Sequence, residues 1–309
     1  FPEWTLTEPL VGLGWDPAWT GSIFGLFYSD IEAGIYMMIL DSTGKPLGSP
    51  TLIEEDVGCR SVSVAAIESG FTLAWIKEGN WSGELTHCDR SSIPDELRMK
   101  VVSISGEVIS ETTVIDHSAD SPVDLATDES GFGIVYDDVV DGPISCMTRF
   151  LKVDGSTWTI SPSGILGIGY DATVRWVGDH YSTAWIRRES EVYNGICVAR
   201  FGTDGSLEMA PVCNDTTDSG IFSVYTLRMA AGNDGLAVTL SSGDAAVEAM
   251  TGLFFLRLDA AGTAVDDPVA VPPEGLSYCY SSNMDWSTNG IGIFRQSDYG
   301  TMLFQFFTE

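Results

Sequence analysis

The chain has 309 residues, of which 15 are basic and 44 acidic, so its formal net charge is −29 at pH 7. A chain this acidic lacks the positive charge needed to bind nucleic acid or an anionic membrane, and we expect neither partner. The acidity suits a soluble protein that meets cations, basic proteins or neutral sugars, and it equally suits a role in solubility alone. Apolar residues make up 44% of the chain, enough for a core, but no apolar run reaches the roughly 18 residues of a membrane span.

Six cysteines, few lysines and many Asn-Gly, Asp-Gly and Ser-Gly turns indicate an oxidising compartment. We therefore expect a secreted, periplasmic or cell-surface protein. The first residue is Phe1 rather than Met, and we expect that a signal peptide or anchor has been removed. A zinc site is not expected, because the sequence has no C-x-x-C pair and only three histidines.

One structural unit recurs along the whole chain. An alternating strand ends in a small polar turn, and a glycine then opens a second, strongly apolar strand such as SGFTLAW (69–75). After a loop of variable length comes a third strand, for example ELRMKVVSISG (96–106), which turns into a weaker fourth strand, EVISETTVI (107–115). No amphipathic helix is predicted. The second strands begin near positions 21, 70, 131, 180, 235 and 290, which are 49, 61, 49, 55 and 55 residues apart.

Six repeats of four strands, each about 50 residues long, predict an all-β, six-bladed β-propeller in a single domain. The sixth repeat stops after its third strand, TMLFQFF (301–307), whereas the N-terminal EWTLTEP (3–9) resembles an unpaired fourth strand. We expect this N-terminal strand to close the last blade, which would remove exposed strand edges. A β-sandwich is the alternative, and the regular period disfavours it. The expected blades are residues 10–55, 56–117, 118–166, 167–215, 216–273, and 274–309 together with 1–9.

The repeat resembles that of secreted bacterial β-propeller proteins, in which a Gly-opened strand ends in Ala-Trp and the next strand ends in D-x-x-G. These features stand here at residues 70–75, 182–185 and 258–262. The resemblance implies the fold alone, because such families bind, cleave or serve as scaffolds. The sialidase Asp-box, S-x-D-x-G-x-T-W, is matched incompletely by KVDGSTW (152–158), and no arginine triad can be assigned, so we do not expect sialidase activity.

The segment NGICVARFGTDGSLEMAPVC (194–213) predicts a hairpin that turns at Asp204-Gly205 and carries one cysteine on each strand. Cys197 and Cys213 flank the turn symmetrically, which predicts a cross-strand disulfide. Direct opposition of the two requires an odd-length loop or a bulge. A Cys59–Cys88 disulfide is also predicted, with Cys88–Cys146 as the alternative, because sequence does not fix the connectivity.

Alternate residues of the innermost strands are predicted to face the central channel. These positions are Gly14, Ser63, Asp124, Thr173, Arg228 and Asn283, then Asp16, Ala65, Ala126, Arg175, Ala230 and Asp285, with Asp171 one step further out. The charged members of this set are the candidate ligand-binding residues Asp16, Asp124, Asp171, Arg175, Arg228 and Asp285. They could hold a cation or the hydroxyls of a sugar, or pair with one another and with water.

The loops of the expected ligand face are acidic, and the longest is KEGNWSGELTHCDRSSIPDE (77–96). Its Trp81, His87 and Arg90 are further candidate ligand-binding residues. Trp81 could stack on a sugar ring or dock a partner, or it could pack back on its own loop. Asp137, Asp138 and Asp141 are the candidate calcium ligands, because hard cations favour clustered oxygens, although their spacing matches no established calcium loop.

The sequence contains no G-x-S-x-G, H-E-x-x-H or P-loop signature. We predict an extracellular binding or adhesion propeller that recognises a glycan, a cation or a basic protein on its acidic loop face. One alternative is a glycan-processing hydrolase or lyase that uses carboxylates such as Asp124 and Asp285. The other is a structural subunit of an extracellular assembly that packs against copies of itself.

Overall fold

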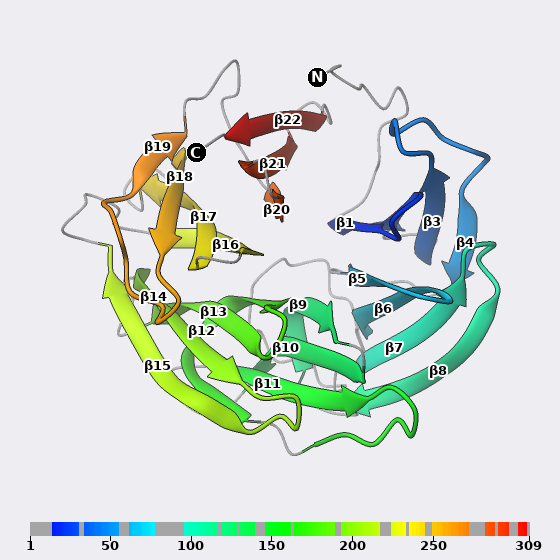
Figure 1. Cartoon of the computed structure of the whole chain (residues 1–309), viewed down its shortest axis with the longest axis horizontal. Coiled ribbons are helices and arrows are strands. Elements are labelled where there is room, and N and C mark those ends of the chain that lie inside the picture. Colours follow the sequence, from blue (N-terminus) through cyan, green and yellow to red (C-terminus); the bar gives the residue numbers. More distant parts are fainter. Residues whose placement is uncertain are drawn as a thin grey trace. The chain divides into compact units, whose positions relative to one another are not determined.

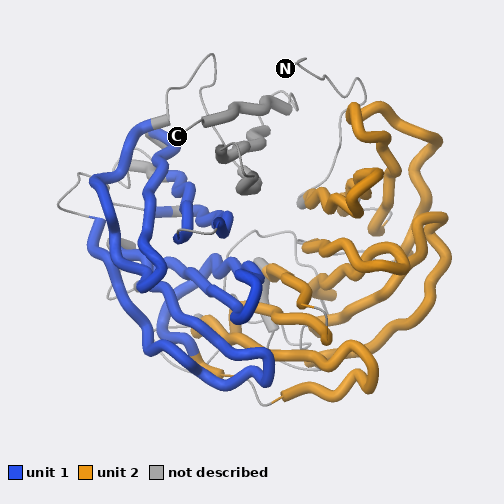
Figure 2. Tube along the Cα trace, in the orientation of Figure 1, with its two compact units in different colours: residues 1–9, 166–309 blue, residues 10–165 orange. Residues whose placement is uncertain are grey.

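The computed structural model shows strands joined by turns and loops. Within the residues that it describes there is no helix, and therefore none long and apolar enough to cross a membrane. Figure 2 shows two compact units, unit 1 (residues 1–9 and 166–309) and unit 2 (residues 10–165). The structure describes residues 14–30, 34–55, 62–77, 96–115, 119–128, 130–139, 146–161, 164–188, 193–216, 224–232, 235–244, 249–271, 282–287, 290–296 and 302–307.

Unit 2 is built of antiparallel strands that follow their order in the chain (Figure 1). The first group is β1 (Gly14–Trp19), β2 (Phe24–Asp30), β3 (Gly34–Leu40) and β4 (Thr51–Glu54). The second is β5 (Val62–Ile67), β6 (Gly70–Lys77), β7 (Glu96–Ser103) and β8 (Val108–Ile115). The third is β9 (Ala119–Thr127), β10 (Gly131–Val139) and β11 (Cys146–Asp154).

Unit 1 repeats this arrangement (Figure 1). Its first group is β12 (Gly164–Trp176), β13 (Tyr181–Arg188), β14 (Tyr193–Phe201) and β15 (Leu207–Asp215). Its second is β16 (Val224–Gly232), β17 (Gly235–Asp244), β18 (Ala249–Leu258) and β19 (Val269–Val271). Its third, within the described residues, has three strands, β20 (Ser282–Ser287), β21 (Gly290–Gln296) and β22 (Met302–Phe307).

The predicted second strands open on glycine because the third strand leaves no room for a side chain. A Cβ on Gly70 would lie 2.2 Å from the carbonyl oxygen of Val102, and one on Gly235 would lie 2.3 Å from that of Leu258. Both glycines also have positive φ values, 147° and 148°. The strand starts predicted at these glycines are confirmed, and the close approach of two backbones explains why the residue recurs.

The D-x-x-G motif forms the turn between the third and fourth strands. The N–H of Asp259 donates to the carbonyl of Thr263 at 2.8 Å, and the N–H of Gly262 donates to the carbonyl of Asp259 at 2.9 Å. Gly262 has a φ of 78°, the left-handed conformation of a three-residue hairpin loop. The same pair of hydrogen bonds forms in residues 41–45 and 103–107.

This turn also fastens one sheet of unit 1 to its neighbour. Asn214, in β15, donates from Nδ2 to the carbonyl of Gly262 at 2.8 Å, and its Oδ1 accepts from the N–H of Ala264 at 3.0 Å. A Cβ on Gly262 would lie 3.0 Å from the Cβ of Val198 in β14. The turn of the second sheet therefore rests directly on the outer strands of the first.

Apolar cores fill the spaces between neighbouring sheets, so that central strands are buried on both faces. In β6, Phe71, Leu73 and Trp75 join the core shared with β1–β4, whereas Ala74 and Ile76 join the core shared with β9–β11. This explains why the second strands are apolar at nearly every position instead of alternating.

The innermost strand β5 is likewise enclosed, since it packs against both β1 and β9. Val62 and Val64 lie in the first core, as the sequence predicted for the inter-blade positions. Ala65 was predicted to face a channel, but it packs against the second core, and Ser63 is only 3% exposed. The alternate positions of this strand meet a neighbouring sheet because the inner strands lie side by side.

The predicted Cys197–Cys213 disulfide is confirmed, and its cysteines are directly opposed with Cα atoms 4.0 Å apart. The turn is a three-residue loop, and β15 carries two one-residue register shifts that bring Cys213 opposite Cys197. Pro211 lies in this irregular stretch of an edge strand, where its missing N–H costs no ladder hydrogen bond. Cys59, Cys88 and the N-terminal strand 3–9 lie outside the described residues, so those predictions stay untested.

Removal of the disulfide is expected to destabilise the fold without changing it. A bridge with a sequence separation of 16 contributes about 3 kcal/mol to the free energy of unfolding. We expect the C197A/C213A variant to lose about this much relative to the native chain when both are denatured with urea under oxidising conditions. A variant as stable as the native chain would contradict this assignment.

Acid is expected to weaken the turn at Asp154. Its Oδ1 accepts hydrogen bonds from Ser156 Oγ at 2.7 Å and from the N–H of Thr157 at 2.7 Å, and these donors lower the pKa of Asp154 below its usual value. The contribution is present above the unfolded pKa near 3.9 and is lost as pH falls through the folded value. D154N should therefore have a lower melting temperature than the native chain at pH 7. The difference in melting temperature between the two proteins should be smaller at pH 3. The exposed Asp266 supplies the control D266N, which should show neither effect.

Candidate functional site

Carboxylates from two strands of unit 2 meet at one serine hydroxyl. Ser63 Oγ lies 3.0 Å from Asp16 Oδ2 and 2.9 Å from Asp124 Oδ1. Asp16 Oδ2 also accepts from the N–H of Val64 at 2.8 Å, and Asp124 Oδ1 accepts from the N–H of Leu125 at 2.9 Å. Both aspartates are half-buried, so this network links β1, β5 and β9 at the inner end of three sheets.

In unit 1 a buried carboxylate links two inner strands in a similar way. Asp171 is 5% exposed, and its Oδ2 accepts from the N–H of Leu227 in β16. It lies in a register shift of β12 between Tyr170 and Thr173, and its φ is 52°. A non-glycine residue in this conformation inside a bulge is strained, and it is held there by its contacts with β16.

Two predicted arginines lie on these inner strands. Arg228 Nη1 donates to Asp171 Oδ1 at 3.1 Å and to the carbonyl of Leu227 at 2.6 Å. Arg175 Nη1 donates to the carbonyl of Val174 at 2.6 Å. The Arg228 side chain is 27% exposed, so its positive charge neutralises the buried carboxylate while part of the guanidinium still reaches solvent.

The predicted calcium ligands Asp137 and Asp138 are consecutive in β10, so their side chains point to opposite faces of the strand. Both are buried. Asp137 Oδ1 accepts from Thr148 Oγ1 at 3.2 Å, and Asp138 pairs with Arg149. Asp141 lies outside the described residues, and within them no group of three His, Cys, Asp or Glu residues is placed to hold a metal ion. Calcium binding stays a prediction.

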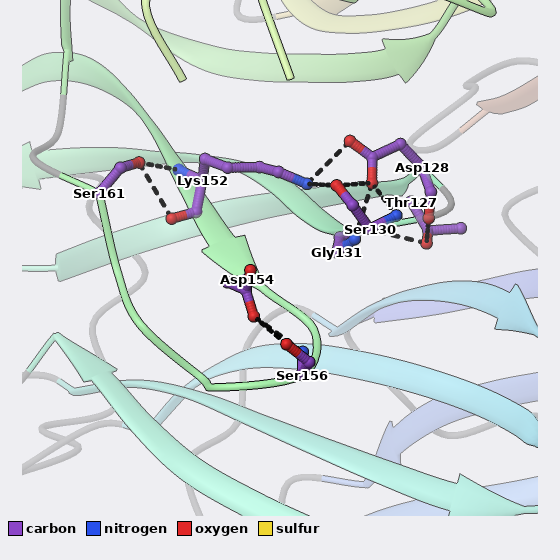
Figure 3. Close-up of polar contacts among 8 residues, drawn as sticks. All are labelled: Thr127, Asp128, Ser130, Gly131, Lys152, Asp154, Ser156 and Ser161. Carbon is purple, nitrogen blue, oxygen red and sulfur yellow. Dashed lines mark hydrogen bonds and ion pairs between the residues drawn. The ribbon is translucent and has the colours of Figure 1, made fainter. Parts of the chain in front are cut away.

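A buried ion pair that the sequence did not reveal lies in unit 2 (Figure 3). Lys152 Nζ is 2.8 Å from Asp128 Oδ2, and the two side chains are 6% and 2% exposed. Asp128 Oδ1 also accepts from Ser130 Oγ at 2.9 Å and from the N–H of Gly131 at 2.7 Å. The ion pair ties the β9–β10 turn to β11, and the contacts of Asp128 with residues 130 and 131 close the turn itself, so we interpret this cluster as structural. Its sequence signal was a lysine between two apolar residues, Leu151 and Val153, in β11.

The remaining predicted site residues cannot be placed with the others. Trp81, His87 and Arg90 lie outside the described residues. Asp285 belongs to β20, but only its backbone position is described. The structure therefore brings Asp16 together with Asp124, and Asp171 with Arg228.

Chemically, the inner strands of unit 2 offer carboxylate acceptors, and those of unit 1 offer a carboxylate and guanidinium donors. Either kind of group suits hydroxyl-bearing ligands. Hydrogen bonds from backbone N–H groups hold one oxygen of Asp16 and one of Asp124 in fixed positions. Sequence reasoning placed Ser63 at the right register position but did not select it as a site residue. Its signal was that it stands at the same register position as Asp124.

No protein-family model matches this sequence, and no curated protein sequence matches it. Among solved structures, the chain is similar to a Dyadobacter fermentans protein of unknown function, with a TM-score of 0.67 and 8% identity over 98% of this chain and 95% of that one. It is also similar to the subtype N10 neuraminidase-like protein of A/little yellow-shouldered bat/Guatemala/060/2010, with a TM-score of 0.56 and 10% identity over 98% of this chain and 96% of that one. A Lactobacillus brevis α-L-arabinofuranosidase gives a TM-score of 0.50 and 11% identity over 85% and 96%.

Identities this low show the fold alone, and the neighbours have propeller-type folds. The prediction of an all-β chain of the propeller type is therefore confirmed at this level. The number of blades is not established by these similarities, because no closed ring is described.

Loss of the Asp171 charge is expected to destabilise unit 1. D171N leaves a neutral amide against the N–H of Leu227 and the Arg228 guanidinium, and we expect a loss of about 1–3 kcal/mol in the free energy of unfolding. The matched control is D179N, whose carboxylate is 87% exposed and should change stability by less than about 0.5 kcal/mol. Equal effects of the two substitutions in urea denaturation would contradict a linking role for Asp171.

Proposed function

We propose that this chain is an extracellular carbohydrate-binding propeller whose inner-strand polar side chains contact the ligand. The observation that carries the proposal is the meeting of Asp16 and Asp124 at the Ser63 hydroxyl. Half-buried carboxylates fixed by backbone N–H groups are preorganised acceptors, and hydroxyl groups are what a sugar presents to them. The ligand hydroxyls would add to the same network.

We further propose that the propeller has six blades and that the N-terminal strand 3–9 closes it. The support comes from the last sheet, which has three strands among the described residues where the sheets of β1–β4, β5–β8 and β16–β19 have four. A fourth strand would pair with β22, the edge strand of that sheet among the described residues.

The neighbours and the disulfide support the glycan and extracellular parts of the proposal. Two of the structural neighbours are a neuraminidase-like protein and an α-L-arabinofuranosidase, names that connect this fold to glycans by analogy. The Cys197–Cys213 bridge fits an oxidising location.

A binding role is favoured over hydrolysis by the contacts of the two carboxylates. One oxygen of Asp16 and one of Asp124 accept from backbone N–H groups of their own or the adjacent inner strand. Such contacts fix the carboxylates as links between strands, whereas an acid catalyst must exchange its proton with the substrate. That the chain recognises a basic protein stays a prediction from its acidity. That it assembles with copies of itself likewise stays a prediction from the sequence.

The proposal is tested on a glycan array, with and without calcium. We expect the native chain to retain at least one class of glycan, and D124N to bind it about tenfold or more weakly, because one charge-assisted hydrogen bond is lost. D179N alters an exposed turn carboxylate and should bind as the native chain does. W81A should also weaken retention of the glycan, because Trp81 is a candidate ligand-binding residue of the loop 77–96. Absence of any retained glycan, or release of a cleaved product, would reject the proposal.

A further inference from the structure

The two cysteines of the confirmed disulfide differ sharply in their exposure to solvent. Cys197 is 1% exposed and stands opposite Trp185, which is itself 2% exposed. Cys213 is exposed on β15, which lies at the edge of its sheet and, among the described strands, pairs with β14 alone. A reagent in solution therefore reaches the bridge at Cys213, because β13 and β15 flank Cys197 on both sides.

The open edge also fits the geometry of thiol–disulfide exchange. An attacking thiolate approaches one sulfur from the side opposite the other sulfur, which is the leaving group. For attack at Cys213 this side lies beyond the edge strand β15. For attack at Cys197 it is occupied by β13, where Trp185 is buried. Access to the bridge thus selects Cys213.

We propose that Cys213 is a thiol-exchange site, at which small thiols such as glutathione open the bridge in the folded protein. A thiolate forms a bond to Cys213 Sγ, and the bond between the two cysteine sulfurs breaks. Its electron pair leaves on Cys197 Sγ, which takes a proton from water, and Cys213 is left as a mixed disulfide. A second thiol attacks the mixed disulfide and releases Cys213, so two thiols are oxidised to one disulfide while the bridge is reduced.

The exchange is reversible at this site. The ladder between β14 and β15 continues on both sides of the bridge, where Ile196 is opposite Asn214 and Val198 is opposite Val212. These pairs keep the two sulfurs close together after the bridge has opened. A negative charge on the buried Cys197 is poorly solvated, so removal of the external thiol favours closure of the bridge.

Opening the bridge also reaches the next sheet of unit 1. Asn214 follows Cys213 directly, and it holds the turn 259–263 through its hydrogen bonds to Gly262 and Ala264, 2.8 and 3.0 Å long. The bridge fixes β15 against β14 beside these contacts. Without it β15 is attached by a ladder with two register shifts, so its hold on the turn weakens. The proposal therefore couples the thiol content of the surroundings to the packing of β15 on this turn.

The first test treats the folded native chain with glutathione at about pH 8, where part of the thiol is ionised. Free thiols are then blocked with iodoacetamide, and both groups are mapped by peptide mass spectrometry. We expect glutathione on Cys213 and the alkyl group on Cys197 at least about tenfold more often than the reverse. The initial rate should change by less than about twofold as urea is raised below the unfolding transition, because the attack needs no unfolding.

Two results of this test would overturn the proposal. One is a mixed disulfide that is shared equally between the two cysteines. The other is an initial rate that rises with urea in step with the unfolding equilibrium constant, which would show that the bridge opens only in unfolded molecules. Both results are read at Cys197 and Cys213, so reactions of the remaining cysteines do not enter. A native chain that binds no glycan would leave the proposal unaffected.

The second test measures hydrogen exchange at the N–H of Ala264, which donates to Asn214. Under oxidising conditions this N–H should exchange about tenfold faster in C197A/C213A than in the native chain, because β15 holds the turn less firmly. The N–H of Asp259 is bonded within its own turn and should change less, so it is the internal control.

N214A is the matched variant for this second test. It removes the hold on the turn but keeps the bridge, so its Ala264 N–H should exchange as fast as that of C197A/C213A. C213A also lacks the bridge, and it replaces the double variant if that one does not fold. An Ala264 N–H that is as protected without the bridge as with it would overturn the coupling to the turn.

Discussion

The structure depends on the burial of its central strands from both sides. Apolar cores lie between the described sheets, those of β1–β4, β5–β8 and β9–β11 in unit 2 and those of β12–β15 and β16–β19 in unit 1. As a result β6 contributes Phe71, Leu73 and Trp75 to one core and Ala74 and Ile76 to another. A strand enclosed in this way has no solvent-facing side, so a polar group on it is costly to bury unless it finds a partner inside the protein. In β6 the side-chain atoms Thr72 Oγ1 and Trp75 Nε1 are buried without a hydrogen-bond partner. The polar network of the inner strands follows from this constraint.

The same constraint explains where charge is tolerated. Lys152 and Asp128 are both almost fully buried, and they are accommodated because each neutralises the other and a turn supplies further donors (Figure 3). Asp171 meets the same requirement with an N–H of the neighbouring strand and the Arg228 guanidinium. The sheets are also joined at their outer ends, where Asn214 holds the turn at Gly262. Polar links thus connect neighbouring sheets at both their inner and outer ends.

The candidate site is built from these links. Carboxylates that connect strands are also preorganised acceptors, so a structural network and a binding site can be formed by the same residues. The strained conformation of Asp171 shows that the fold holds at least one inner-strand carboxylate against its local preference. The high acidity of the chain, by comparison, says little about the site, since most of the carboxylates lie elsewhere.

The sequence by itself determined the local elements. The glycines at 70 and 235 open strands because a carbonyl approaches them, and the D-x-x-G turns form from short-range hydrogen bonds, so both leave a pattern in neighbouring residues. The Cys197–Cys213 pairing was visible for the same reason. Only the tertiary structure decided that Ala65 packs in a core, that Asp171 sits in a bulge, and that Ser63 joins residues 47 and 61 positions away. Those outcomes depend on how one sheet packs against the next. The alternation of residues within a single strand does not predict that packing.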